Sequence, residues 1–94
     1  MSDSVVEKQL AAILGRRLQQ LRVAKGLSQD AVANEAGISR QHYQLLESGW
    51  GKREGKTPAN PRLSTLIALS RVLDTTVPAL VNDIFGSLDA DVYS

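Results

Sequence analysis

Length and composition describe one small globular domain. The chain has 94 residues, of which 43% are hydrophobic and 22% charged, and its net charge is +1. A disordered chain would be more polar, and a membrane protein would need a long apolar run. The lack of cysteine excludes disulfides, thiolate catalysis and thiol zinc sites. Because a domain of this size buries a little over roughly 60% of its unfolded surface, its core is thin, and dimerisation would extend it.

The distribution of charge is more informative than its sum. Between Gly15 and Arg62 nine Lys and Arg residues stand against four Asp and Glu residues, whereas residues 74–94 hold four acids and no base. A small protein can segregate charge by chance, but the pattern favours contact between the middle of the chain and a polyanion. The start, MSDSVVEKQLAAILGRR, has no basic run before its apolar residues and no small-residue cleavage site. We therefore predict no signal peptide and a cytoplasmic location.

Helical periodicity predicts an all-α fold of five helices. The first follows the capping-box spacing of SVVE, repeats leucine every three or four residues, and is expected to end near Gly26. Ser28 and Ser39 are the types that cap helices, and Gly37 and Gly49 are the type that ends them. Two short helices over 29–36 and 40–48 are thus separated by GIS alone, with Ile38 as its one apolar residue. Such a pair must cross steeply and share a core, as in a helix-turn-helix.

The second half of the chain predicts a loop, two helices and a tail. GWGKREGKTPA, from Gly49 to Ala59, is typical of an exposed loop. Asn60 and Pro61 are expected to cap and open a fourth helix, whose apolar side would consist of Leu63, Leu66, Ile67 and Leu73. Thr76 is expected to cap a fifth, whose apolar stripe consists of Val77, Leu80, Val81, Ile84 and Phe85. Residues 86–94 are expected to form a short, frayed acidic tail.

The third helix separates into an apolar and a polar arc when its residues are placed about 100° apart. The inward arc holds Tyr43, Leu46, His42 and Glu47, and the outward arc holds Arg40, Gln41, Gln44, Leu45 and Ser48. Arginine can hydrogen-bond guanine O6 and N7, glutamine can do the same with adenine, and leucine can touch a thymine methyl. Taken alone, such residues on an isolated helix favour an ordinary solvated face. The capped helices, the short turn and the neighbouring bases favour contact with DNA bases.

The run LGRRLQQLRVAKGLSQDAVANEAGISRQHYQLLESG, followed by NPRLSTLIALSRVLDTTVPALV, resembles the XRE family of lambda-repressor-like helix-turn-helix domains. The resemblance covers residues 13–85 and implies a five-helix bundle that binds a double-stranded DNA operator, generally as a dimer. Residues 1–12 would then extend the first helix, and 86–94 would be the tail. The resemblance also implies that Arg22 pairs with Glu47 for a structural purpose and that Gln29 contacts a phosphate and braces the third helix. Base contacts would come from Arg40, Gln41, Gln44 and Leu45, and further phosphate contacts from Ser39 and Ser48.

One departure from the family is the long segment WGKREGKTPAN after ESG. Lys52, Arg53 and Lys56 in this segment are candidates for phosphate contact, although they would also keep a glycine-rich loop soluble. Trp50 is compatible with stacking on a nucleotide or with covering a core edge. The five apolar residues of the last stripe, from Val77 to Phe85, exceed what a terminal helix needs, so we predict a twofold-symmetric dimer through them.

These features predict a transcriptional regulator, with repression the commoner mode, in a phage, restriction-modification or antitoxin context. The alternative is an interaction module of the same fold that docks on a partner protein, for which Leu45 is the single apolar anchor on the outward arc. An enzyme is disfavoured, since His42 is the one histidine and no Walker-type loop occurs. No metal, cofactor or membrane contact is expected.

Overall fold

Five helices make up the fold in the computed structural model, which describes residues 3–50 and 57–93, with side chains for 5–50 and 57–86. They are α1 (Asp3–Ala24), α2 (Gln29–Ala36), α3 (Arg40–Ser48), α4 (Leu63–Val72) and α5 (Val77–Tyr93). Within the described residues there is no strand, only an isolated antiparallel bridge between Trp50 and Pro58. The predicted all-α, five-helix fold is confirmed.

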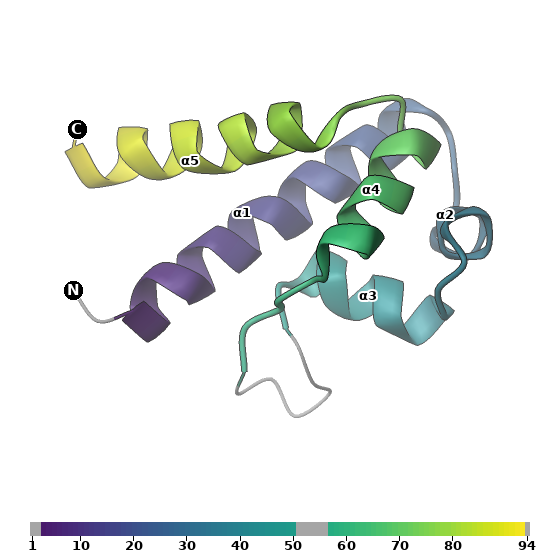
Figure 1. Ribbon diagram of the computed structural model, residues 1–94, viewed down its shortest axis with the longest axis horizontal. Coiled ribbons are helices and arrows are strands. Elements are labelled where there is room, and N and C mark those ends of the chain that lie inside the picture. The colour runs from purple at the N-terminus through teal and green to yellow at the C-terminus, as the bar shows by residue number, and fades with distance from the viewer. Residues whose placement is uncertain (1–2, 51–56, 94) are drawn as a thin grey trace.

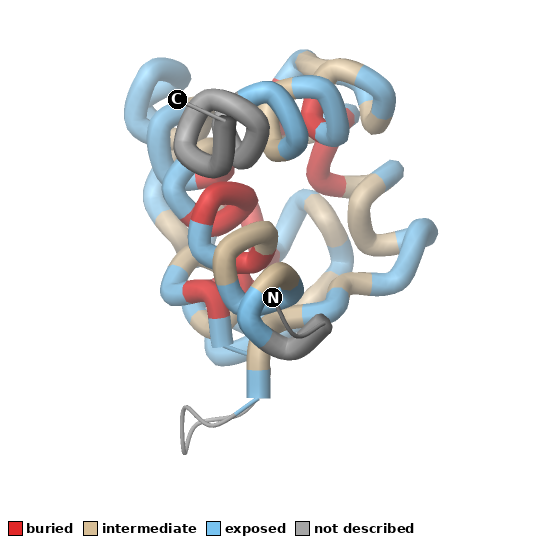
Figure 2. The backbone as a smooth tube through the Cα atoms, turned by 90° about the vertical axis from the view of Figure 1, so that its left-hand side faces the viewer, coloured by how far each residue is buried: buried red, intermediate tan, exposed pale blue. Residues whose placement is uncertain are grey.

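The long helix α1 supports α3 and α5, and α2 and α4 join the bundle through those two helices (Figure 1). It packs against α3 on one side and α5 on the other, while α2 contacts α3 and α4. The residues of the buried cluster that joins them are among those drawn red in Figure 2, and they are Leu14, Leu18, Val32, Ala33, Tyr43, Leu46, Leu69 and Leu73. Each helix except α5 contributes to this cluster, and α5 adds Ile84 at its edge.

Local capping explains where the short helices begin and end. The Ser28 and Ser39 hydroxyls accept hydrogen bonds from the amides of Ala31 and His42, each at 3.0 Å. Gly37 and Gly49 end α2 and α3 with φ angles of 75° and 84°, a left-handed conformation that costs glycine little. These predicted caps are confirmed, as is the Thr76 cap of α5, which accepts from the Ala79 amide at 3.1 Å.

The predicted start of the fourth helix was wrong. Helix α4 begins at Leu63 after Arg62, which makes no side-chain capping bond. The Ala59 amide donates to the Gly49 carbonyl at 2.9 Å, and Trp50 pairs with Pro58, so the chain before Asn60 is held extended beside the end of α3. Because of this pairing, α4 begins at Leu63, two residues or about half a turn later than predicted.

The expected apolar side of α4 was also partly wrong. Leu69 and Leu73 are buried and Leu66 is half-buried, whereas Leu63 is 64% exposed and Ile67 is 37% exposed. Leu66, Leu69 and Leu73 follow the three- and four-residue spacing of a single helical arc. Leu63 and Ile67 belong to the neighbouring arc, which faces away from the core.

At the carboxyl end, α5 runs on to Tyr93, so residues 86–93 are helical where a frayed tail was expected. Gly86 does not interrupt the helix, because one glycine costs only about 1 kcal/mol in a helix interior and no proline follows it. The stripe on α5 is divided: Leu80 is buried and Val77 and Ile84 are half-buried, but Val81 and Phe85 are exposed.

Gly15 permits the closest contact between helices, and its role was not foreseen from the sequence. A methyl group at this position of α1 would lie 2.8 Å from the Leu46 carbonyl oxygen and still closer to that of Glu47. Since both obstacles are backbone atoms at the end of α3, any side chain would force the two helices apart.

We expect Gly15→Ala to lower the free energy of unfolding by about 1–3 kcal/mol because of this overpacking. Gly86→Ala is the matched control: Gly86 is also helical, no atom lies within 4 Å of its added methyl group, and alanine favours helix by about 1 kcal/mol. Denaturant unfolding of the two variants measures both effects. Equal stability of Gly15→Ala and the wild type would contradict the close approach of α1 and α3.

Candidate nucleic-acid interface

The helix-turn-helix forms from α2, the turn at Gly37–Ser39 and α3. Figure 1 shows α2 nearly end-on and α3 from the side, so the two helices cross steeply. Ile38 packs from the turn against the buried cluster, and the Ile38 amide donates to the Ala33 carbonyl at 3.0 Å. The short turn therefore leaves α3 at the surface with one side fixed to the core.

The two arcs of α3 are arranged largely as the sequence predicts. Tyr43 and Leu46 are buried, while Arg40, Gln41, Gln44 and Ser48 are exposed and Leu45 is half-buried. His42 departs from the prediction, because it is exposed rather than turned inward. It lies where the two arcs meet, so a small rotation of α3 is enough to expose it.

Behind the exposed arc, Glu47 forms the predicted ion pair with Arg22 of α1. The Arg22 Nε and Nη2 atoms donate to the two carboxylate oxygens of Glu47 at 2.6 and 3.2 Å. Arg22 Nη1 also donates to the Leu27 carbonyl at 3.0 Å. Only 14% of the Arg22 side chain and 7% of the Glu47 side chain are exposed. Such a two-point, shielded pair fixes the rotation of α3 relative to α1.

Hydrogen bonds continue from Glu47 to the surface of α3. The Gln29 side-chain amide donates to Glu47 Oε1 at 3.0 Å, and its carbonyl oxygen accepts from Gln44 Nε2 at 3.3 Å. The bracing role expected for Gln29 is thus present. Arg22, Glu47, Gln29 and Gln44 form what we call the Glu47 relay, which joins α1 to the exposed arc.

Protonation equilibria in the relay reflect both burial and pairing. Burial raises the pKa of Glu47, but the hydrogen bonds from Arg22 and Gln29 outweigh it and leave that pKa below its ordinary value. The hydrogen bond to Glu47 raises the pKa of Arg22 further. Burial raises the pKa of the Tyr43 phenol well above its usual range. All three groups therefore keep their neutral-pH charge states, and Glu47 stays ionised.

Comparison with known proteins gives the family. Residues 13–83 match the model of a helix-turn-helix domain. The chain is 38% identical over 79 residues to the SPbeta prophage-derived HTH-type transcriptional regulator YonR of Bacillus subtilis (strain 168), covering 84% of this chain and 66% of that protein. It is 30% identical over 71 residues to the HTH-type transcriptional regulator SinR of Bacillus licheniformis, covering 76% of this chain and 58% of that protein.

The chain belongs to the helix-turn-helix domain family. It spans about three fifths to two thirds of the length of the curated relatives it matches. The family match ends at Asp83, so the second half of α5 lies beyond it. The match includes the whole of α2, the turn and α3, which are the elements that carry the exposed arc.

The two serines predicted to contact phosphate lie at opposite ends of α3. Ser39 caps the amino-terminal end and is exposed. The Ser48 hydroxyl donates to the Leu45 carbonyl at 2.8 Å, which turns it back onto its own helix. Lys52, Arg53 and Lys56 lie outside the described residues.

Trp50 lies just after α3, in the short segment that pairs with Pro58. Its amide donates to the Leu45 carbonyl at 3.0 Å, and its side chain is 38% exposed. Trp50 lines a cleft of 250 Å³ together with His42, Leu45 and Pro58. The tryptophan is therefore partly covered and lies beside the exposed arc rather than over the main core.

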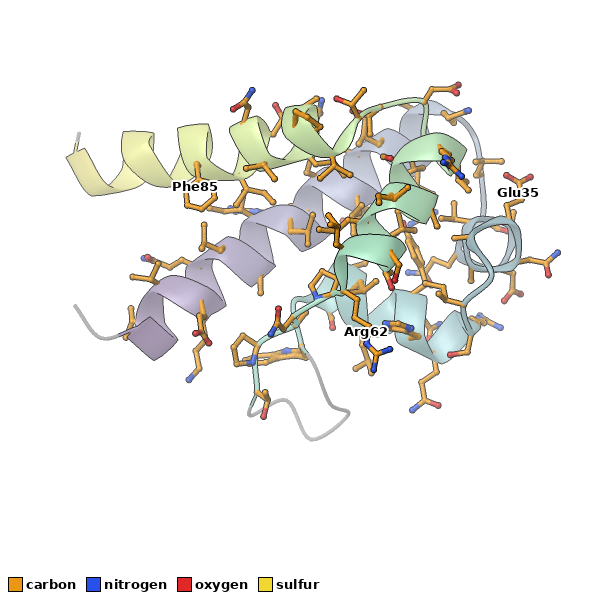
Figure 3. All side chains as sticks on the ribbon, in the orientation of Figure 1. Glu35, Arg62 and Phe85 are labelled. Carbon is orange, nitrogen blue, oxygen red and sulfur yellow. The ribbon has the colours of Figure 1, made fainter. Side chains whose placement is uncertain are left out.

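Two residues near α3 were missed in the sequence analysis. Arg62 is exposed before α4, and Figure 3 shows it projecting from there toward the side of the molecule where α3 lies. Asp30 of α2 pairs with Arg40, with 3.3 Å between Oδ1 and Nε. Arg62 was counted as part of the basic segment, but its direction depends on where α4 begins. The Asp30 pair depends on the crossing of α2 and α3.

The described part of the chain offers neither a metal site nor a single membrane-spanning helix. No group of three His, Asp or Glu side chains there is arranged to hold a metal. No single helix there is long and apolar enough to cross a membrane; α4 with residues 77–86 meets the length and composition only as a pair bent by 100°.

The lowered pKa of Glu47 predicts a pH dependence of stability. Between its folded pKa and the ordinary value of about 4.3, the unfolded state binds more protons, so stability is fully present above this window and falls as the pH drops through it. We expect Glu47→Gln to lose about 3 kcal/mol of unfolding free energy at pH 7, because Arg22 loses its charged partner. The difference in unfolding free energy between Glu47→Gln and the wild type should become smaller below about pH 4.

Urea unfolding from pH 7 to pH 3 measures this difference. Asp83→Asn is the control, because it breaks the Arg17–Asp83 pair, which is 39% and 40% exposed and is expected to contribute less than about 1 kcal/mol. If the unfolding free energies of Glu47→Gln and the wild type differ by the same amount at every pH in this range, the role of the Glu47 charge is contradicted.

Proposed function

We propose that this domain is a sequence-specific DNA-binding transcriptional regulator that occupies an operator with α3 in the major groove, and that it acts as a repressor. The observation that carries the proposal is an exposed polar arc on a helix whose other side is fixed by a buried ion pair. A reader of base edges needs hydrogen-bonding side chains at the surface and a rigid helix beneath them. The relatives named as HTH-type transcriptional regulators support this proposal.

In this proposal Arg40, Gln41, Gln44 and Leu45 read base edges. Arg40 and Gln41 stand in the first turn of α3, which is the part of a recognition helix that enters the groove deepest. Gln44 is held by Gln29 at 3.3 Å, so its amide reaches the DNA already oriented. Leu45 is half-buried and offers an apolar edge to a thymine methyl.

The backbone of the operator would be held around this arc. The Ser39 hydroxyl accepts from the His42 amide at 3.0 Å and keeps its own hydrogen for a phosphate. Arg62 adds a positive charge on the same side (Figure 3), and Gln29 adds a further phosphate contact. Ser48 would join these contacts only by turning its hydroxyl away from the Leu45 carbonyl. Lys52, Arg53 and Lys56, outside the described residues, complete the positive charge of this segment. Such contacts set register and affinity without reading sequence.

We also propose that the regulator is a homodimer formed through α5 and that it is cytoplasmic. Val81 is 38% exposed and Phe85 is 49% exposed, and Figure 3 shows Phe85 on the side of α5 that faces α1. They continue a stripe whose other members, Val77, Leu80 and Ile84, are buried or half-buried. A twofold dimer would cover the exposed part and set two α3 helices about one DNA turn apart on a pseudo-palindromic site.

We expect Arg40→Ala and Gln41→Ala each to weaken operator binding by about 1–3 kcal/mol and to relax preference at particular base pairs. Fluorescence anisotropy on a duplex selected from random sequence, and on a scrambled duplex, measures both effects. Arg71→Ala is the control, since Arg71 is exposed at the end of α4 that points away from α3 (Figure 1). Equal losses on both duplexes would show that Arg40 and Gln41 touch only the DNA backbone.

We expect Phe85→Asp to convert the dimer to a folded monomer and to weaken operator binding on the order of 10²-fold, because the two half-sites are then bound independently. Analytical ultracentrifugation gives the mass, and circular dichroism checks the fold. Val23→Asp is the control, because Val23 is 60% exposed on α1 outside the stripe. A wild type that sediments as a monomer at all concentrations would refute the stable dimer.

A further inference from the structure

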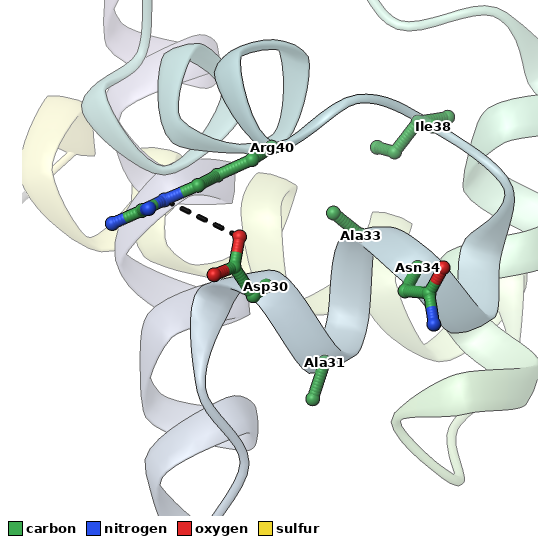
Figure 4. Close-up of a pocket in the computed structure, with 6 residues that line it drawn as sticks. All are labelled: Asp30, Ala31, Ala33, Asn34, Ile38 and Arg40. Carbon is green, nitrogen blue, oxygen red and sulfur yellow. Dashed lines mark ion pairs between the residues drawn. The ribbon is translucent and has the colours of Figure 1, made fainter.

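A hollow at the junction of α2 and α3 contains an exposed ion pair between Asp30 and Arg40. The hollow has a volume of 430 Å³ and is lined by Asp30, Ala31, Ala33, Asn34, Ile38 and Arg40 (Figure 4). Asp30 Oδ1 lies 3.3 Å from Arg40 Nε, and the two side chains are 65% and 63% exposed. An ion pair this exposed contributes little to folding, so its position at the start of α3 calls for another explanation.

The geometry of the pair leaves the outer edge of the Arg40 guanidinium available to bind a base. Asp30 faces the Nε edge of the guanidinium, whereas the outer edge carries the donors of Nη1 and Nη2. Arginine has five N–H donors in one plane, and two of them suffice for guanine O6 and N7. A guanidinium can therefore keep Asp30 on one edge while the other edge binds a guanine.

The charge of Asp30 has the opposite effect on the rest of the DNA. Glu47, the nearest acid along α3, is shielded and neutralised by Arg22. Glu35, the other acid of α2, is exposed, and Figure 3 shows it pointing away from α3. Among the described acids of the helix-turn-helix, Asp30 is thus the one that stands at the start of the exposed arc, where a phosphate backbone would be repelled by it unless Arg40 stays in place.

From these observations, and building on the proposed DNA-binding function, we infer that Asp30 is a specificity-determining positioning residue. On DNA with a guanine at the matching position, Arg40 binds Asp30 and the base together. On DNA without it, Arg40 turns to a phosphate, and the Asp30 carboxylate is left unpaired beside a polyanion. Asp30 thereby enlarges the difference between the right base and the wrong one while lowering affinity for DNA in general.

The test compares wild type, Asp30→Asn, Arg40→Ala and the double variant on the selected duplex and on duplexes with each base pair changed singly. We expect Asp30→Asn to raise affinity for scrambled DNA by about two- to fivefold and to lower discrimination by a similar factor, the size of an exposed ion pair. The lost discrimination should be confined to the base pair that Arg40→Ala also relaxes, and it should vanish in the Arg40→Ala background. Asp30→Glu should restore it.

Glu35→Gln is the matched control, because it removes the same charge from the same helix on the side away from α3. If Asp30→Asn and Glu35→Gln change the affinity for DNA by the same factor, and neither alters the preference at any single base pair, the inference is overturned and the proposed function remains intact. A wild type that enriches no sequence would overturn both. Denaturant unfolding of each variant at the binding temperature shows that the compared proteins are folded.

Discussion

The ion pair between Arg22 and Glu47 is the interaction on which the other parts of this domain depend. Two charges with 14% and 7% of their side chains exposed are tolerated only in good geometry, so the pair fixes where α3 lies on α1. The glycine at position 15 allows the backbones to approach at the same place. Gln29 and Gln44 then transmit that fixed position to the surface. The core and the exposed arc are therefore parts of one arrangement, and a change in the buried carboxylate reaches both.

The domain separates its surfaces by chemistry. The exposed arc of α3 is polar and takes its rigidity from hydrogen bonds behind it, whereas α5 exposes two apolar residues, Val81 and Phe85. A small domain has a thin core, and the proposed dimer would cover the exposed part of the α5 stripe and leave the α3 arc for a polar ligand. Asp30 adds a third element, a carboxylate beside a basic side chain, which favours selectivity over general affinity for a polyanion.

Periodicity and capping residues were enough to predict the five helices, the turn at Gly37–Ser39 and the inward position of Tyr43 and Leu46. These depend on local rules, since a serine hydroxyl satisfies amides three residues away and a glycine accepts a positive φ. The start of α4 could not be predicted, because the bond between Ala59 and Gly49 joins residues ten positions apart along the chain. The pairing of Asp30 with Arg40 and the contact at Gly15 depend on how helices cross, which no local pattern encodes. The pairing of Arg22 with Glu47 came from family resemblance rather than from spacing.

We propose that DNA binds to the arc of α3 that the Glu47 relay holds in place. Nuclear magnetic resonance of the ¹⁵N-labelled protein, titrated with the selected duplex, shows which surface the DNA contacts. We expect the largest shifts in the backbone amides of the first turn of α3 and in the side-chain amides of Gln29 and Gln44, with smaller shifts along the start of α1. Shifts concentrated instead around Phe85 and the amino-terminal half of α1, with the Gln29 and Gln44 side-chain signals unchanged, would contradict it.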